Sequence, residues 1–250
     1  MMRLSRIDLS TPARKQQFNE LHFAISAPRY DLVTRILSFG QDASWKRQLI
    51  AALPPLENPV CLDLACGTGD ITFRLAEKFP GARIEGIDIS EPMLDIARRR
   101  NRHLHVSLSR KGMCPLDFPD NHADLITGGY ALRNAPDLCR TLAEIHRVLK
   151  PRGMAAFLDF SKPEGVAAQK IEYWLLKFWG GLWGLLLHGD SKIHGYISAS
   201  LAAYPARGRL QNLFRDRGFE ILQRRRFFFG VTEMTVLRRQ SAPGGPAGQI

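Results

Sequence analysis

The sequence predicts an α/β fold in which a seven-stranded, mostly parallel sheet carries helices on both faces. Three observations support this prediction. Short apolar runs alternate with helical periodicities between residues 60 and 160. The first run turns through two glycines directly into a helical pattern. Two more apolar runs near the end of the chain suit a hairpin that places an antiparallel strand at the sheet edge. The length of 250 residues fits a single domain.

An N-terminal helical cap is expected over residues 18–53. Pro28 separates its first helix from its second, and Gly40 ends the second. Residues 1–17 are charged and lack a hydrophobic period, so they are expected to form a flexible arm or a frayed helix. The apolar positions that recur at helical spacing are Phe18, Leu21, Ile25, Leu32, Ile36, Leu37, Trp45, Leu49, Ile50 and Leu53.

The remaining elements follow in order. Residues 162–205 are expected to form a helical insertion, and the Gly- and Pro-rich residues 241–250 a disordered tail, so that residues 18–240 make one domain. Arg152 and Gly153 are expected to end the helix before the fifth strand. Strands are predicted at 60–65, 83–89, 104–108, 123–129, 154–160, 219–226 and 231–238, and helices near 70–79, 91–100, 136–149 and 207–217.

The glycine turn after the first strand indicates a ligand site. A phosphate-binding P-loop would need a lysine that this turn lacks, and a dinucleotide site would need a small residue where Thr72 stands. The pattern Asp63-x-Ala65-x-Gly67-x-Gly69 instead resembles the first motif of class I S-adenosylmethionine (SAM) methyltransferases, with Ala65 in place of the usual first glycine. A glycine turn that only packs a helix on a strand is the simpler alternative.

Asp88, at the end of the second predicted strand, strengthens the ligand interpretation. An acidic side chain at that point can accept hydrogen bonds from both ribose hydroxyls of an adenosine. Asp88 could instead cap the helix that begins near Pro92. The turn and the acid together favour an adenosine ligand, and the form of the turn favours SAM over NAD.

Several further segments resemble the ubiquinone/menaquinone-biosynthesis C-methyltransferase (UbiE-like) family. The resemblance covers residues 18–220 and implies the class I SAM-methyltransferase (Rossmann-like) fold, SAM as methyl donor and S-adenosylhomocysteine as product. The matching segments are 30–32, 37–40, 45–47, 62–70, 118–121, 131–134, 147–153, 160–163 and 196–205.

The chain departs from the family pattern at four places. Gly112-Met113 stands where the family has Asn or Asp followed by Ala, and Gly129 stands where a serine commonly contacts SAM. Ala131 replaces a glycine, and a C-terminal Gly…His-x-Gly element is missing around residues 230–238. These departures leave cofactor binding intact and concern the part of the pattern that bears on the methyl acceptor.

The resemblance also assigns roles to residues. Arg133 is expected to stabilise a phenolate on the acceptor ring, with a structural salt bridge or surface position as the alternative. Tyr30 and Asp31 are expected to orient the acceptor, although Asp31 could merely cap the helix that follows it. Methyl transfer needs no metal, and the sequence offers no metal-ligand spacing. The expected cofactor-binding residues are Asp63, Ala65, Gly67, Thr68, Gly69, Thr72, Asp88, Ile89, Met93, Met113 and Gly129.

The segment 173–187 carries three of the four tryptophans among leucines and glycines. It is too short to span a bilayer and contains a lysine. Such a helix suits a membrane-surface patch or the mouth of a tunnel for a lipophilic substrate, and ordinary core packing is the alternative.

The net charge of +11 indicates an acidic partner. The arginine runs at 98–102 and 224–226 are expected to form solvated faces, and no nucleic-acid-binding module accompanies them. We therefore expect peripheral contact with an anionic membrane and no nucleic acid, and a homodimer is left open. Four scattered cysteines and a polar N-terminus favour the cytoplasm, at the inner face of a membrane.

The expected activity is methyl transfer to a ring carbon of a lipophilic quinol or phenol in ubiquinone or menaquinone biosynthesis. The departures from the family pattern keep two alternatives open. One is a methyltransferase of the same fold that acts on carbon, oxygen or nitrogen of another lipophilic small molecule. The other is an accessory subunit without catalysis.

Overall fold

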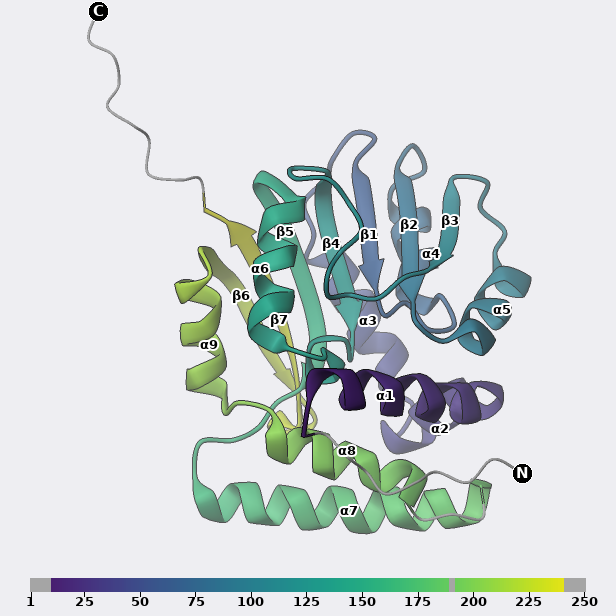
Figure 1. Cartoon of the computed structure of the whole chain (residues 1–250), viewed down its shortest axis with the longest axis vertical. Coiled ribbons are helices and arrows are strands. Elements are labelled where there is room, and N and C mark those ends of the chain that lie inside the picture. The colour runs from purple at the N-terminus through teal and green to yellow at the C-terminus, as the bar shows by residue number, and fades with distance from the viewer. Residues whose placement is uncertain (1–9, 189–191, 241–250) are drawn as a thin grey trace, which may run out of the picture.

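The computed structural model describes residues 10–188 and 192–240, with the side chains of 186–195 left undescribed. Its seven strands form one sheet in the order β3-β2-β1-β4-β5-β7-β6 (Figure 1). All pairs are parallel except those that β7 makes with β5 and β6. The strands are β1 (Val60–Leu64), β2 (Arg83–Asp88), β3 (Val106–Arg110), β4 (Ala123–Gly129), β5 (Leu149–Phe160), β6 (Phe219–Phe227) and β7 (Thr232–Arg239).

The final hairpin is present as predicted, but its antiparallel strand does not lie at the sheet edge. The antiparallel strand β7 lies inside the sheet between β5 and β6, and β6 occupies the edge. An alternation of apolar residues predicts that a segment is a strand, but it does not predict which strand pairs with it. Here residues Met154–Phe160 of β5 pair with Thr232–Arg238 of β7, and this pairing sets the order of the sheet.

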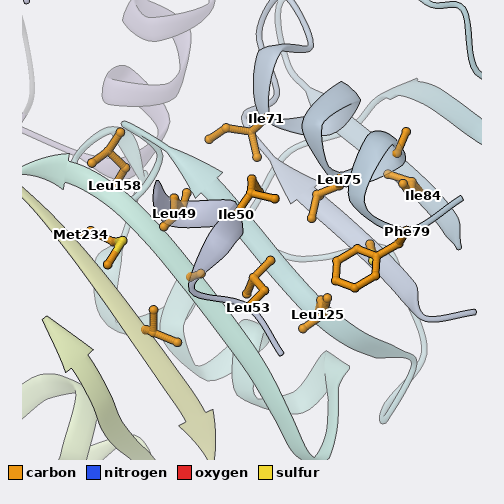
Figure 2. Close-up of a cluster of buried hydrophobic side chains, with 14 of the residues drawn as sticks. Leu49, Ile50, Leu53, Ile71, Leu75, Phe79, Ile84, Leu125, Leu158 and Met234 are labelled. Atoms are coloured by element: carbon orange, nitrogen blue, oxygen red, sulfur yellow. The ribbon is translucent and has the colours of Figure 1, made fainter. Parts of the chain in front are cut away.

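The two faces of the sheet are covered by helices with separate cores. On one face, Leu49 and Ile50 of α3 (Asp42–Ala51) pack with Ile71 and Leu75 of α4 (Asp70–Lys78), as Figure 2 shows. On the other face, α6 (Leu138–Val148) packs against β5, and α9 (Arg207–Asp216) packs against the edge strand β6. The helix α5 (Glu91–Arg100) connects β2 to β3. These buried apolar layers give the sheet a rigid frame.

From β1 onward, several element boundaries differ from the prediction, by up to five residues. The strand β3 begins at Val106, two residues later than expected, and β5 begins at Leu149, five residues earlier. The helix α6 ends at Val148 because Leu149 is already extended and pairs with Ala123 of β4. Arg152 and Gly153 therefore lie within β5 and do not end the helix.

The N-terminal cap contains three helices and a short 3-10 turn. These are α1 (Pro12–Ser26), η1 (Ala27–Arg29), α2 (Tyr30–Leu37) and α3. The cap begins earlier than predicted, because Thr11 caps α1 by accepting a hydrogen bond from the backbone N–H of Arg14, and proline suits the first helical position. Residues 12–17 are thus helical, whereas residues 1–9 of the expected arm and the expected tail at 241–250 lie outside the described residues.

The insertion forms two packed helices, α7 (Val166–His188) and α8 (Lys192–Ala203). In Figure 1, α7 is the outermost layer, α8 lies between α7 and α1, and the parallel strands point their carboxyl ends toward these helices. Ligand sites of α/β sheets lie at the carboxyl ends of strands, so the cap and the insertion together cover the expected site.

Candidate active site

The turn between β1 and α4 has three residues in the left-handed region: Ala65 (φ 51°), Gly67 (φ 55°) and Gly69 (φ 87°). A Cβ on Gly69 would lie 2.5 Å from the ring of Phe73 and would displace it, and the φ of 87° itself favours glycine there. A Cβ on Gly67 would meet nothing within 4 Å. Gly67 therefore borders open space, and its backbone is accessible to a ligand.

Asp88 lies beside this turn. Its carboxylate accepts hydrogen bonds from the backbone N–H groups of Gly67 (2.8 Å) and Ser90 (2.8 Å). Burial raises the pKa of the Asp88 carboxyl, and these backbone hydrogen bonds oppose that shift. A carboxylate has lone pairs for more than two donors, so Asp88 can still receive ribose hydroxyls from the cavity that it faces.

A small cavity of about 50 Å³ begins at the turn and at Asp88. Gln16, Asn19 and Phe23 of α1 and Tyr30 of α2 close it from the cap. The sequence-predicted cofactor residues that line it are Ala65, Gly67, Asp88, Ile89, Met93, Met113 and Gly129.

Four predicted cofactor residues do not line this cavity. Gly69 and Thr68 lie farther along the turn. The Asp63 carboxylate is fully buried and accepts hydrogen bonds from the hydroxyls of Thr72 (2.6 Å) and Thr127 (2.8 Å). Burial raises the pKa of Asp63 to about 6, although the hydrogen bonds from Thr72 and Thr127 act to lower it. Asp63 and Thr72 therefore tie β1 to α4 and β4, and the geometry favours a supporting role over the predicted contact.

A large cavity of about 750 Å³ lies between the cap, η2 (Leu132–Asn134), η3 (Phe228–Gly230) and α7. Its walls are mostly aliphatic and aromatic. The side chains that line both this cavity and the small one form a shared wall, which consists of Phe23, Tyr30, Tyr130 and Asn134. The two cavities are therefore adjacent, and these four side chains lie between them.

Arg133 faces the large cavity from η2 and is only 4% exposed. Its guanidinium donates to the hydroxyl of Ser200, lies 3.5 Å from Asp159 and stacks over the ring of Phe160 at 5.1 Å. The predicted position at the mouth of the sheet and the alternative of a salt bridge therefore both hold, and the alternative of a surface arginine is wrong. A buried cation beside an apolar cavity can stabilise an anionic oxygen.

Tyr30 and Asp31 were predicted to act together, but the structure separates them. Tyr30 belongs to the shared wall, and burial raises the pKa of its hydroxyl to about 12. Asp31 lines neither cavity. Its carboxylate accepts from the Thr68 hydroxyl (2.7 Å) and from Arg100 (2.8 Å). Asp31 thus fastens α2 to the glycine turn, and Arg100, expected on a solvated face, takes part because the fold brings α5 against the cap.

Sequence reasoning missed a buried polar network behind Arg133. The Tyr196 hydroxyl lies within hydrogen-bond distance of the amide oxygens of Asn19 and Asn134. Asn19 donates to the carbonyl of Asn134 (2.8 Å), and Asn134 donates to that of Tyr130 (2.7 Å). Asn134 and Tyr196 stand in the motif segments, which could have indicated them. Asn19 has no such signal, because one polar residue in a helical pattern is typical of a solvated face.

A second missed network supports Tyr130. Its hydroxyl donates to the buried carboxylate of Asp42 (2.6 Å). Lys46 pairs with Asp42 (2.7 Å) and with Asp70 (3.0 Å). Burial lowers the pKa of Lys46, but the two carboxylates outweigh burial and raise it above its ordinary value. This ion pair connects α3 to α4 and fixes the Tyr130 ring in the shared wall.

A model of the ubiE/COQ5 methyltransferase family matches residues 11–236, which is most of the chain. The chain belongs to this family. Among curated relatives, it is similar to the demethylmenaquinone methyltransferase of Thermus thermophilus, with 36% identity over 80% of this chain and 91% of that protein. It is also similar to the enzyme of the same name from Geobacillus stearothermophilus, with 32% identity over 89% of this chain and 96% of that protein.

As a member of the ubiE/COQ5 family, the chain is a SAM-dependent methyltransferase, and the predicted class I fold is confirmed. Two solved structures support the fold alone, because each shares only 19% sequence identity with this chain. The [4+2]-cyclase SpnF superposes with a TM-score of 0.68 over 91% of this chain and 97% of that one. A SAM-dependent methyltransferase from Mesorhizobium loti superposes with a TM-score of 0.58 over 79% and 98%.

Proposed function

We propose that this ubiE/COQ5 family member transfers the methyl group of SAM to a ring carbon of a lipophilic quinol of the menaquinone type. The observation that carries the proposal is the shared wall between a cavity at the SAM motif and a large apolar cavity. Methyl transfer is an in-line displacement, so donor and acceptor must meet at one point with little freedom. The names of the curated relatives support the quinone ring as acceptor.

The residues around the small cavity fit a SAM molecule. The open backbone at Gly67 suits the amino-acid end, Asp88 suits the ribose, and Ile89 and Met113 suit the adenine faces. The bound sulfonium would supply an activated methyl group. Asp63, Thr68, Gly69 and Thr72 would then shape the turn without touching the cofactor.

Arg133 would act on the acceptor ring. A quinol carbon becomes nucleophilic when a ring hydroxyl loses its proton, and a buried cation lowers the free energy of the resulting phenolate. The guanidinium is held by Asp159 and Ser200, so it needs no reorganisation during the reaction. Tyr30 and Asn134 in the shared wall would orient the ring against the methyl group.

The large cavity opens through an aromatic rim, which consists of Phe39, Phe178, Phe228 and Phe229. Each of these side chains lines the cavity and is also exposed. Trp174 and Leu175 extend the exposed apolar surface along α7. Among the described residues, no helix is both long enough and apolar enough to cross a bilayer. We propose that the rim rests on an anionic membrane, where its apolar area and the net positive charge would both favour binding.

A methyl-transfer assay tests the proposal. Purified protein is incubated with methyl-labelled SAM and either demethylmenaquinol or a ubiquinol precursor in detergent. We expect label in the menaquinol ring, and an Asp88→Ala variant serves as the control for background. Transfer to neither ring above that background would contradict the proposal.

The departure around η3 favours a second candidate function. Where the family carries a histidine element, this chain places Phe228 and Phe229 on the aromatic rim. A methyltransferase for another lipophilic small molecule would also use such a cavity. The quinone profile of a deletion strain separates the two functions, because unchanged quinones together with a missing secondary metabolite would support this second candidate.

A further inference from the structure

The large cavity contains a carboxylate that the proposed chemistry does not use. Glu172 lies on α7 between apolar cavity-lining neighbours, Ile171 and Leu175, and is only 9% exposed. Within the described part of the chain, its carboxylate makes no hydrogen bond or ion pair. Its carboxylate oxygens are not among the fully inaccessible polar atoms of the described residues, so they face the space of the cavity. A carboxylate in an otherwise apolar wall, with no protein donor, is placed to accept a hydrogen bond from a ligand in that cavity.

The cations near Glu172 are held by other groups. Arg207, at the start of α9, donates to the Ser161 hydroxyl (2.7 Å) and to the carbonyl of Gly230 (2.6 Å). Lys162, after β5, donates to the carbonyls of Ala202 (2.6 Å) and Tyr204 (3.1 Å). Both cations therefore affect Glu172 only by long-range electrostatic attraction, without a hydrogen bond.

Burial raises the pKa of Glu172 to about 7, and the fields of Arg207 and Lys162 oppose this shift. Besides Glu172 and Arg207, the charged side chain that lines the large cavity is Arg133, and it is held by Ser200 and Asp159. The carboxyl group is therefore close to half ionised at neutral pH, and it is available to a ligand.

We propose that Glu172 is the residue that recognises a hydroxyl of the methyl acceptor, by accepting its hydrogen bond. The inference rests on the proposed function, in which the acceptor is a quinol with two ring oxygens. One oxygen meets Arg133, which can only donate, and the other meets Glu172, which when ionised can only accept.

This arrangement distinguishes the reduced ring from the oxidised one. A quinol hydroxyl satisfies the Glu172 carboxylate, whereas a quinone carbonyl places two acceptors against each other and leaves both without a donor. Discrimination of this kind is strong when the ligand fills the cavity, because the ligand then displaces the water that could otherwise satisfy the carboxylate. Glu172 is thus a specificity-determining residue on the wall that the insertion provides.

Ligand binding tests the inference without requiring methyl transfer. The probe is a 1,4-naphthoquinone with a short prenyl chain, in its oxidised form or reduced with dithionite. Binding is followed through the fluorescence of Trp45 and Trp179, which line the cavity. At pH 8 we expect the wild-type protein to bind the quinol about tenfold more tightly than the quinone.

The Glu172→Gln variant should lose this preference, because its amide can donate to a carbonyl as well as accept from a hydroxyl. The Glu172→Asp variant keeps the carboxylate and should keep the preference at lower affinity. Glu77→Gln, on the exposed face of α4, is the matched control and should behave as the wild type. Thermal melting of each variant checks that it is folded.

The pH dependence provides a second measurement. The wild-type preference for the quinol should fall as the pH drops below about 7, because a protonated Glu172 can donate to the quinone. In Glu172→Gln the ratio should not change with pH. An unchanged preference in Glu172→Gln, or no binding of either form to the wild type, would overturn the inference. Failure of the wild type to transfer a methyl group, with the binding preference intact, would instead contradict only the proposed reaction.

Discussion

The hydroxyl of Thr68 donates a hydrogen bond of 2.7 Å to the carboxylate of Asp31. This contact joins the glycine turn of the cofactor motif to the first turn of α2 in the N-terminal cap. Arg100 of α5 reaches the same carboxylate (2.8 Å) and also the carbonyl of Thr68 (3.2 Å). The cap that closes the small cavity is therefore fastened to the turn that shapes it.

Asp31→Ala should weaken SAM binding. Loss of this carboxylate leaves Thr68 and Arg100 without their shared acceptor and frees α2 from the turn. The contact is partly exposed, so we expect about a fivefold to tenfold rise in the dissociation constant by calorimetry. Asp95→Ala, which removes another exposed partner of an arginine on α5, is the control and should leave SAM binding unchanged. Equal affinity in Asp31→Ala and the wild type would show that the contact does not order the turn.

Gly67→Ala and Gly69→Ala should differ in their effects on stability and on SAM binding. Gly69→Ala forces a Cβ to 2.5 Å from Phe73 at φ 87° and should cost about 2 kcal/mol or more of unfolding free energy. Gly67→Ala has open space, and its φ of 55° is close to that of Ala65, so it should cost only about 1 kcal/mol. Its methyl group would instead enter the proposed cofactor space and reduce SAM affinity. Chemical denaturation and calorimetry on both variants measure the two effects, and retention of SAM affinity in folded Gly67→Ala would argue against that location.

Asp63 should make stability fall as the pH rises. Its pKa is about 6 in the folded protein against an ordinary value of 3.8, so between these values the folded state binds more protons than the unfolded state. The contribution of Asp63 to the unfolding free energy should therefore decrease by about 2 kcal/mol from pH 4 to pH 7. Asp63→Asn removes this group, so the stability difference between the wild type and Asp63→Asn should shrink over the same range. Urea denaturation measures it, and a constant difference would contradict the prediction.

Arg133→Met should lower kcat by about a hundredfold to a thousandfold with little change in the KM for SAM. The side chain keeps its packing against Phe160 but loses the charge that would stabilise the phenolate. Steady-state methyl transfer to demethylmenaquinol measures the effect, with melting temperature as a check, because Asp159 loses its partner. Arg98→Met, on the exposed face of α5, is the control. A rise in the KM for demethylmenaquinol with kcat unchanged would indicate that Arg133 contributes to acceptor binding and not to ring activation.

Phe229→Ser should reduce binding to anionic vesicles by about tenfold, since a phenyl ring contributes about 1.5–3 kcal/mol when it leaves water. Phe229 is fully exposed on the aromatic rim, with a relative exposure of 102%. Leu104 is equally exposed, at 106%, but lies outside the large cavity before β3, so Leu104→Ser is a matched control. Vesicle sedimentation measures both. Equal losses in the two variants, or none in either, would contradict a membrane contact at the rim.

Much of the fold followed from local patterns. The strand–helix alternation, the glycine turn and the position of Asp88 depend on residues that are close in sequence, and periodicity reports such relations directly. The roles of Asp31 and Arg100 could not be predicted in this way. They are distant in sequence, and each is typical of a helix cap or a solvated face until the fold brings them to Thr68.

Short segments of the chain were enough to predict the family, the class of fold and the residues around the SAM motif, because the backbone conformation of such segments is set locally. The residues that share a wall became visible only once the chain was folded. The tertiary structure placed Asp63 behind the turn rather than in the small cavity, it joined Phe23, Tyr30, Tyr130 and Asn134 between two cavities, and it turned Glu172 inward. The physical reason is that burial and hydrogen-bond partners come from packing between distant segments, and a residue's chemistry follows from what it is packed against.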